Sequence, residues 1–161
     1  FVKNKHTLLI DEFKFRCCVG KNGLTSSKKE GDKKTPKGVF EIENLYFRKD
    51  RIKKPLTLLK CIEIRKNMGW CDDIRFPKKY NKLLKKEEKI KHEKLKRKDC
   101  KYDLLIPIKY NFKKPVTGLG SCIFIHITKD YKPTVGCVAL KKKDFLIMLK
   151  IIKKNTKIKI F

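Results

Sequence analysis

Cys137 and His126 are the two residues of this sequence whose side chains together could carry out covalent chemistry. Both lie between Gly120 and Leu140, in two β-prone runs joined by the segment Lys129 to Val135. Apolar alternation along Ser121 to Thr128 predicts a strand with His126 on one of its faces. The stretch therefore predicts a thiol and an imidazole on neighbouring strands.

The second run, Gly136 to Leu140, carries Cys137 and Ala139 on one face. If the two runs pair antiparallel, a register that places His126 opposite Cys137 brings their Cβ atoms to roughly 5 Å. A neighbouring imidazole that takes the thiol proton produces the reactive thiolate, because a free cysteine, with a pKa of about 8.5, is mostly protonated near neutrality. We therefore expect a Cys–His nucleophile.

A structural role for both residues is the alternative. Cysteine in an apolar strand is commonly a small core residue, and a single strand histidine is commonly a hydrogen-bonded structural group. The glycine before Cys137 favours the catalytic interpretation, since it lets another backbone approach closely. The main-chain amides around Gly136 and Cys137 are then candidate donors to an oxyanion.

Three segments of the chain carry a resemblance to a known family: the strand that ends near His126, TVGCVAL from Thr134 to Leu140, and VGKNGLTSSKKEGDKKTPKGVFEI from Val19 to Ile42. The last segment contains a KxGDxxTPxGxF signature, made by Lys29, Gly31, Asp32, Thr35, Pro36, Gly38 and Phe40. With these segments the chain resembles the YkuD-type L,D-transpeptidase catalytic domain, the cysteine enzymes that cross-link bacterial peptidoglycan.

The resemblance implies a mainly β fold, a curved mixed β-sheet sandwich with one or two peripheral helices. It implies Cys137 as nucleophile and His126 as general base, with Gly136 and Thr134 completing the catalytic segment. Peptidoglycan stem peptides would be the substrate, no cofactor or metal would be needed, and the location would be the periplasm or cell envelope. Any targeting segment would have been removed or would lie upstream of Phe1, because the sequence has no apolar signal core.

This sequence departs from the family pattern at two positions. The usual motif has a second histidine before the glycine and an arginine after the cysteine, where this chain has Val135 and Ala139. The segment between His126 and Cys137 is also shorter than is usual, which implies a trimmed lid. The motifs MGWCDD (68–73), HEKL (92–95) and YDLLIPIKYN (102–111) resemble a divergent proteobacterial branch of the family.

Four further residues are candidates for substrate binding. Trp70 and Asp72 would line the cleft and hold an amine of the acceptor stem, with His92 and Asn111 added from the motifs of the divergent branch. The alternative for the Asp pair is a capping turn, and for His92 it is an ordinary surface histidine.

Composition limits the class of protein more than it identifies a partner. The 161 residues predict one domain, 1–161, with its own core. The net charge is +27, but only six of 44 basic residues are Arg, Gln is absent and Ala occurs once. This skew indicates that the nucleotide composition of the genome causes much of the charge. We expect a monomer with no specific nucleic-acid partner and a weak polyanion affinity.

Cysteine usage predicts neither a metal site nor disulfides. The seven cysteines, at 17, 18, 61, 71, 100, 122 and 137, form no C-x-x-C pair, and most lie in apolar runs where a reduced, buried thiol is the simplest account. Reduced thiols sit awkwardly with an oxidising periplasm.

The remaining elements are predicted from periodicity and turn residues. We expect a hairpin at His6 to Ile10 and Phe13 to Val19, a turn-rich loop at Gly20 to Lys37, strands within Val39 to Arg48 and Leu56 to Ile64, an exposed helix or mobile insertion at Tyr80 to Lys98, an edge or bulged strand at Tyr102 to Tyr110 because of Pro107, a helix at Lys141 to Lys153, and a last strand at Thr156 to Phe161.

Two other functions stay open at this point. A peptidoglycan carboxypeptidase or amidase would use the same Cys–His pair with water in place of the amine. A basic module that binds peptidoglycan or another polyanion would do no chemistry at all.

Overall fold

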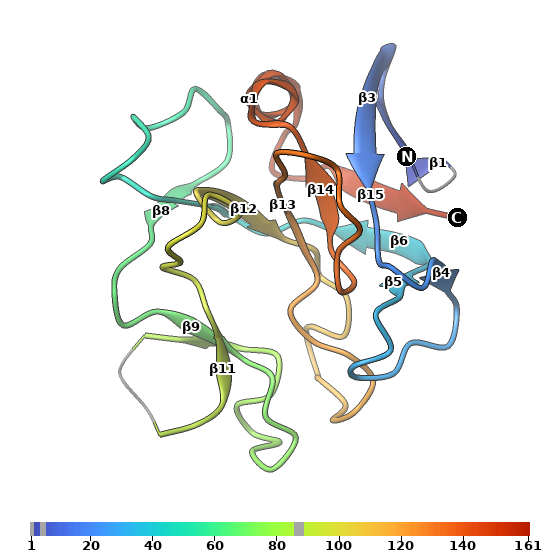
Figure 1. Cartoon of the computed structure of the whole chain (residues 1–161), viewed down its shortest axis with the longest axis vertical. Coiled ribbons are helices and arrows are strands. Elements are labelled where there is room, and N and C mark those ends of the chain that lie inside the picture. The colour runs from blue at the N-terminus through green and yellow to red at the C-terminus, as the bar shows by residue number, and fades with distance from the viewer. Residues whose placement is uncertain (1, 4–5, 86–88) are drawn as a thin grey trace.

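A computed structural model describes residues 2–3, 6–85 and 89–161 of the chain (Figure 1). The described residues form mostly short strands and one helix: β1 (Val2–Lys3), β2 (Thr7–Ile10), β3 (Phe13–Cys18), β4 (Leu24–Thr25), β5 (Thr35–Pro36), β6 (Gly38–Glu41), β7 (Leu45–Phe47), β8 (Cys61–Glu63), β9 (Gly69–Cys71), β10 (Leu83–Leu84), β11 (His92–Lys94), β12 (Leu104–Pro107), β13 (Phe124–Ile127), β14 (Val138–Leu140), α1 (Lys142–Ile151) and β15 (Lys157–Ile160). The prediction of a mainly β chain with a peripheral helix is confirmed.

Ten of these strands hydrogen-bond in the order β6-β15-β1-β2-β3-β14-β13-β12-β7-β8. The sheet is mixed, since β1 with β15, β13 with β14 and β7 with β8 are parallel pairs and the other pairs are antiparallel. It includes the predicted hairpin, in which β2 and β3 pair through a turn with Asp11 at φ 50°. Strand β14 lies between β3 and β13, so the Cys137 segment enters the middle of the sheet.

The sheet curves until its first strand in this order meets β12. Ile42, directly after β6, forms an antiparallel bridge with Ile108, directly after β12. Hydrogen bonds from the Lys109 amide to the Glu41 carbonyl (2.8 Å) and from the Glu43 amide to the Pro107 carbonyl (2.9 Å) flank this bridge. The curved sheet thereby encloses the main apolar core, because the inward side chains of both halves face each other.

The helix closes one side of this core. Its sequence places Phe145, Met148 and Leu149 on one stripe, and each of these side chains is at most 1% exposed. Burying each one contributes about 2 kcal/mol relative to leaving it in water. The predicted helix at Lys141 to Lys153 and the predicted final strand are both confirmed.

The prediction of a helix or mobile insertion at Tyr80 to Lys98 is wrong for the described residues, and residues 86–88 of that range lie outside them. Strands β10 and β11 pair on either side of β9 and make a small three-stranded sheet (Figure 1, green and yellow). Tyr80, Leu84 and Leu95 of this range are buried. Tertiary burial of these few apolar residues outweighs the helix propensity of the Lys and Glu around them.

Pro107 also behaves differently from the expectation. Strand β12 is an interior strand between β13 and β7, and Pro107 is its last residue. The Pro107 carbonyl still accepts a hydrogen bond from the Glu43 amide at 2.9 Å, so the ring removes one donor only, at the end of the strand.

The pairing predicted for the strands of His126 and Cys137 is wrong in direction. Strands β13 and β14 are parallel, with His126 aligned to Ala139 and not to Cys137. Residues 128–137 run back along the end of β3, where Thr134 forms a parallel bridge with Gly20, before β14 begins. The loop is long enough to cross back over a four-residue strand, so it need not close a hairpin.

Candidate active site

Parallel pairing still brings Cys137 and His126 to one face of the sheet. The register that aligns His126 with Ala139 places Cys137, two residues earlier, beside Phe124. The Phe124 amide donates a hydrogen bond of 3.4 Å to the Cys137 Sγ. Thiol and imidazole are thus diagonal neighbours on adjacent strands, a position that separates Cβ atoms by roughly 7 Å.

Both side chains line the same cavity, which has a volume of about 440 Å³. Cys137 is 4% exposed and His126 is 6% exposed, so each sits at the bottom of the cavity and not on its rim. The rim includes Val135, which is 73% exposed. The other described lining residues are Glu93, Arg97, Lys101, Tyr102, Ile127, Thr128, Asp130, Lys132, Pro133, Thr134 and Ala139.

His126 is held as a neutral base. Its Nδ1 lies 2.8 Å from the Ile127 carbonyl, and a carbonyl can only accept, so Nδ1 carries the proton and donates. Burial lowers the pKa of His126 to about 4, and Lys101 and Arg97 nearby act in the same direction. Nε2 therefore keeps its lone pair at neutral pH. The ring is fixed by Tyr102, whose centroid lies 5.4 Å away in an edge-on arrangement.

Cys137 is a neutral thiol in this structure. Burial raises its pKa to about 12, and the hydrogen bond from the Phe124 amide opposes that shift only in part. The thiol donates to the Cys122 carbonyl over 3.2 Å. Cys122 itself has a left-handed backbone, with φ 54°, and its amide donates to the Asn81 side chain at 3.1 Å.

The segment before the cysteine is fixed by Thr134. Its hydroxyl donates to the Cys137 carbonyl at 2.7 Å and accepts from the Gly136 amide at 3.1 Å. Gly136 has φ 144°, and a Cβ there would lie 3.1 Å from the Lys34 carbonyl oxygen, so a side chain would strain this approach. Thr134 and Gly136 therefore position the thiol. The Gly136 amide, which was a candidate oxyanion donor, is occupied by Thr134.

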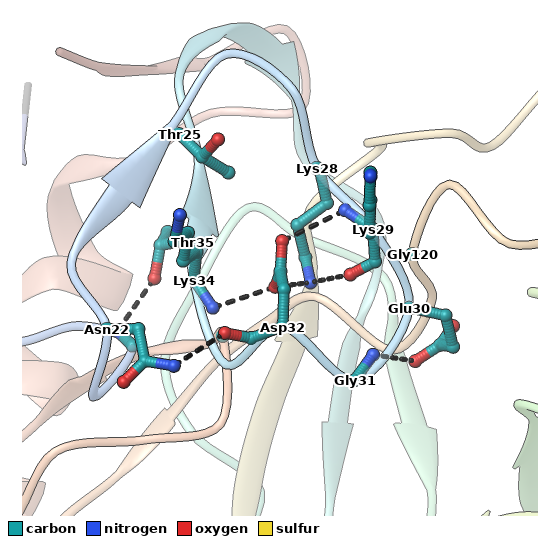
Figure 2. Close-up of polar contacts among 12 residues, drawn as sticks. Asn22, Thr25, Lys28, Lys29, Glu30, Gly31, Asp32, Lys34, Thr35 and Gly120 are labelled. Carbon is teal, nitrogen blue, oxygen red and sulfur yellow. Dashed lines mark hydrogen bonds and ion pairs between the residues drawn. The ribbon is translucent and has the colours of Figure 1, made fainter.

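The loop of residues 20–37 contacts the segment that contains Gly136 and Cys137. Asp32 organises it by accepting hydrogen bonds from the Lys28 ammonium at 2.5 Å and from the amides of Lys29 and Lys34 at 2.9 and 2.8 Å (Figure 2). Burial would raise the pKa of Asp32, but these hydrogen bonds outweigh it and the pKa is lowered.

Thr35 connects that loop to the candidate nucleophile. Its hydroxyl accepts from the Gly20 amide at 2.8 Å and lies 3.5 Å from the Cys137 carbonyl. Asp32 and Thr35 of the sequence signature thus form part of the local scaffold of the Cys137 segment.

The four residues predicted to bind substrate do not line the cavity. Trp70 is buried at 3% exposure between Tyr46, Phe112 and Phe124, and its indole N–H donates to Asn81 at 2.9 Å. Its environment is that of a core residue, and its substrate-binding role stays a prediction.

Asp72, His92 and Asn111 have local partners. Asp72 Oδ2 lies 3.5 Å from the Lys91 ammonium, and the His92 ring packs over Gly69 with its Nδ1 2.6 Å from the Ile90 carbonyl. Asn111 holds a loop, donating to the carbonyls of Val116 and Gly120 and accepting from the Val116 amide. Their substrate-binding role stays a prediction.

Cavity residues beyond the predicted site residues include Glu93 from β11 and Arg97, Lys101 and Tyr102 from the segment before β12. Glu93 follows His92, and alternation along a strand sends consecutive side chains to opposite faces, so one packs on Gly69 while the other reaches the cavity. Arg97 pairs with Glu93 at 2.7 Å and lies 5.0 Å over the Tyr102 ring. Period-two alternation would have found Glu93 once β11 was recognised as a strand.

All seven cysteines are free thiols. No group of three His, Cys, Asp or Glu side chains within the described part of the chain is arranged to hold a metal ion. Among those residues there is also no helix with the length and apolar character needed to span a bilayer.

Comparison with protein families identifies the class to which this fold and site belong. The family model for the L,D-transpeptidase catalytic domain, YkuD, matches residues 2–160. The chain therefore belongs to the YkuD family, and family membership implies L,D-transpeptidase-type activity. Its members are typically cysteine transpeptidases located outside the cytoplasm. No curated protein and no solved structure gives a significant match.

Proposed function

We propose that this protein is an L,D-transpeptidase that cross-links peptidoglycan stem peptides through an acyl-enzyme on Cys137. The observation that supports this most directly is the shared cavity, in which a buried thiol and a neutral imidazole face the same space. We further propose a monomer that acts in the periplasm or cell envelope. The cavity volume of about 440 Å³ admits a short peptide segment.

In the first half-reaction Cys137 Sγ attacks the donor carbonyl between an L-configured centre and its D-residue. His126 Nε2 takes the thiol proton as the C–S bond forms, and then delivers it to the nitrogen of the departing D-amino acid as the C–N bond breaks. The product is a thioester on Cys137.

In the second half-reaction an amine from a neighbouring stem attacks the thioester. His126 removes a proton from the attacking nitrogen and returns one to the leaving sulfur, so the free thiol is restored. Glu93 and Asp130 are the two carboxylates among the described residues that line the cavity with Cys137, paired with Arg97 and Lys132, and each is a candidate to hold the incoming amino group. Of the two amides expected to stabilise the oxyanion, Cys137 remains as the proposed donor, since Gly136 donates to Thr134.

The pKa values favour proton transfer that accompanies attack. Burial disfavours both the thiolate and the imidazolium, so a preformed ion pair is not the resting state. A thiol pKa above the ordinary value is therefore compatible with catalysis here. Reaction of Cys137 with a simple thiol reagent does not separate an enzyme from a binding module, and the acyl-enzyme itself has to be detected.

Hydrolysis is the second candidate outcome. Val135 and Lys132, which line the same cavity as Cys137, are 73% and 84% exposed, so the cavity is open to water that could attack a thioester on Cys137. Attack by water would make the protein a carboxypeptidase or amidase with the same first half-reaction.

The test is mass spectrometry of the protein after incubation with disaccharide stem peptides. We expect an adduct on Cys137, no adduct in Cys137→Ala, and an unchanged adduct in the control Cys100→Ala, which removes a thiol outside the cavity. His126→Ala should slow adduct formation by roughly two to four orders of magnitude.

The products of the same incubation distinguish the transpeptidase, the hydrolase and the binding module. Cross-linked muropeptides support transpeptidation, and trimmed stems without cross-links support the hydrolase. Wild-type protein that binds stem peptides but never forms an adduct would reject both reactions in favour of a binding module.

A further inference from the structure

The loop between β7 and β8 exposes two leucines at its tip. Leu56 is 78% exposed and Leu58 is 71% exposed, and among the large apolar side chains of the described residues only Val135, at 73%, is comparably exposed. In Figure 1 this teal to green loop stands away from the body of the molecule at the upper left. Large exposed apolar residues that stand together usually mark a contact surface.

The loop holds this shape through its own anchors. Ile52 and Leu59, which flank the leucines, are 8% and 6% exposed and belong to the main core. Arg51 donates to the Asp103 carboxylate at 3.1 Å and to the carbonyls of residues 98 and 99, both at 2.9 Å. The loop that carries the leucines is therefore anchored to the body of the protein on both sides of them.

Lysines surround the two leucines. Lys53, Lys54 and Lys60 are exposed, and none of them forms an ion pair with any residue that the structure describes. The one acidic residue in the loop, Asp50, is held by Arg48 through hydrogen bonds of 2.8 and 2.7 Å. The exposed charge beside the leucines is consequently positive.

An open hollow of about 660 Å³ lies at the base of the same loop. Its described lining is cationic around a partly apolar floor: Phe47, Lys49, Arg51, Ile52, Lys53, Lys54, Cys61 and Glu63. The Lys49 ammonium lies 3.9 Å from the Glu63 carboxylate, and because both side chains are exposed this ion pair contributes little to stability. The hollow has the charge and size to receive a phosphate headgroup.

We propose that this loop docks the protein on an anionic phospholipid bilayer. Leu56 and Leu58 enter the interface while Lys53, Lys54 and Lys60 contact lipid phosphates, and the hollow accepts one headgroup. Charge complementarity selects this partner. The lysines, which form no ion pair with any described residue, match the negative headgroups at the bilayer surface, and the leucines match the apolar interior beneath them. The proposal does not depend on the transpeptidase reaction.

Docking would also orient the candidate active site. The Arg48 guanidinium donates to the Arg97 carbonyl at 2.6 Å, and Arg51 binds residues 98, 99 and 103. Arg97, Lys101 and Tyr102 from this same segment line the cavity that holds Cys137. The loop and the cavity wall are thus one hydrogen-bonded unit, so a docked loop holds the cavity at a set orientation to the bilayer.

The experiment is vesicle co-sedimentation with the full chain at about 0.1 M salt. We compare phosphatidylcholine alone with phosphatidylcholine containing about one third phosphatidylglycerol, and expect binding only to the second. Replacing Lys53, Lys54 and Lys60 by Gln should weaken the partition coefficient about 100-fold, at roughly fivefold per lysine. Leu56→Ser with Leu58→Ser should weaken it roughly tenfold.

The matched control replaces Lys153, Lys154 and Lys157 by Gln, because these lysines are exposed, change the net charge equally and belong neither to the loop nor to the lining of the hollow. This control should change binding less than about threefold. An equal loss in the control, or an unaffected leucine variant, would mean diffuse charge attraction and would overturn the proposal.

Two further arms identify the ligand source. Inorganic phosphate that displaces the protein more strongly than chloride of equal ionic strength would indicate a free-anion site and would also overturn it. Leu58→Trp gives a direct readout, since its emission should shift to the blue on anionic vesicles only. Emission that does not change on bound vesicles would refute insertion of the loop.

Discussion

The buried imidazole of His126 makes the free energy of unfolding of this protein decrease as the pH is lowered, by an amount that follows from the pKa of His126. Its pKa is about 4 in the folded chain and about 6.5 in an unfolded one. Above both values the imidazole is neutral in each state and contributes no pH dependence. As pH falls through 6.5 the unfolded chain takes the proton first, so the free energy of unfolding decreases until the folded histidine also titrates near pH 4.

The size of the loss follows from the separation of the two pKa values. A shift of about 2.5 units corresponds to about 3 kcal/mol at full development, and about 2 kcal/mol of this is lost by pH 5. Urea denaturation of wild type and His126→Gln at about pH 7.5 and pH 5 isolates this contribution. Lowered carboxylate pKa values, such as that of Asp32, affect both proteins and cancel in the comparison.

We expect wild type to lose about 2 kcal/mol more than His126→Gln between these two pH values. Both proteins should have similar urea m-values, which keeps the comparison within two-state behaviour. Equal losses in the two proteins would refute the reasoning, because they would show that His126 titrates in the folded chain as it does in water.

Three other predictions follow from the site and its scaffold. Asp32→Ala should lower the free energy of unfolding, measured in urea, by about 3–5 kcal/mol, because it leaves the 4% exposed Lys28 ammonium without its carboxylate. The control Asp130→Ala removes an exposed ion pair with Lys132 and should lower it by less than about 1 kcal/mol. Gly136→Ala, at φ 144°, should cost about 1–3 kcal/mol and reduce acyl-enzyme formation. In a pH profile, kcat/KM should remain above about 90% of its plateau at pH 5.5, where a histidine of ordinary pKa would leave about a tenth. An acidic limb near pH 6.5 would contradict the neutral, buried base.

Local sequence was sufficient for several elements. Two-residue alternation placed His126 and Cys137 on defined strand faces, and 3.6-residue spacing of Phe145, Met148 and Leu149 located α1. The opening hairpin followed from two β-prone runs around a turn. These predictions succeeded because each depends on contacts between residues close in the chain.

The Lys-rich segment before β12 shows where local reasoning fails. Its composition predicted an exposed helix or a mobile insertion, yet β10 and β11 pair with β9, and Leu95 is fully buried. Three or four apolar residues decided the structure because their burial against a distant strand contributes more than the propensity of the lysines between them.

The sequence by itself determined the chemistry available to this protein, namely one thiol after a glycine and one imidazole on an apolar strand. Only the tertiary structure decided how they meet, because alternation sets which face a side chain occupies and says nothing about the direction of the partner strand. Parallel pairing of β13 and β14 makes the two groups diagonal neighbours, and the surrounding strands bury them. Burial then keeps both neutral, since a low-dielectric interior disfavours the charged form of each.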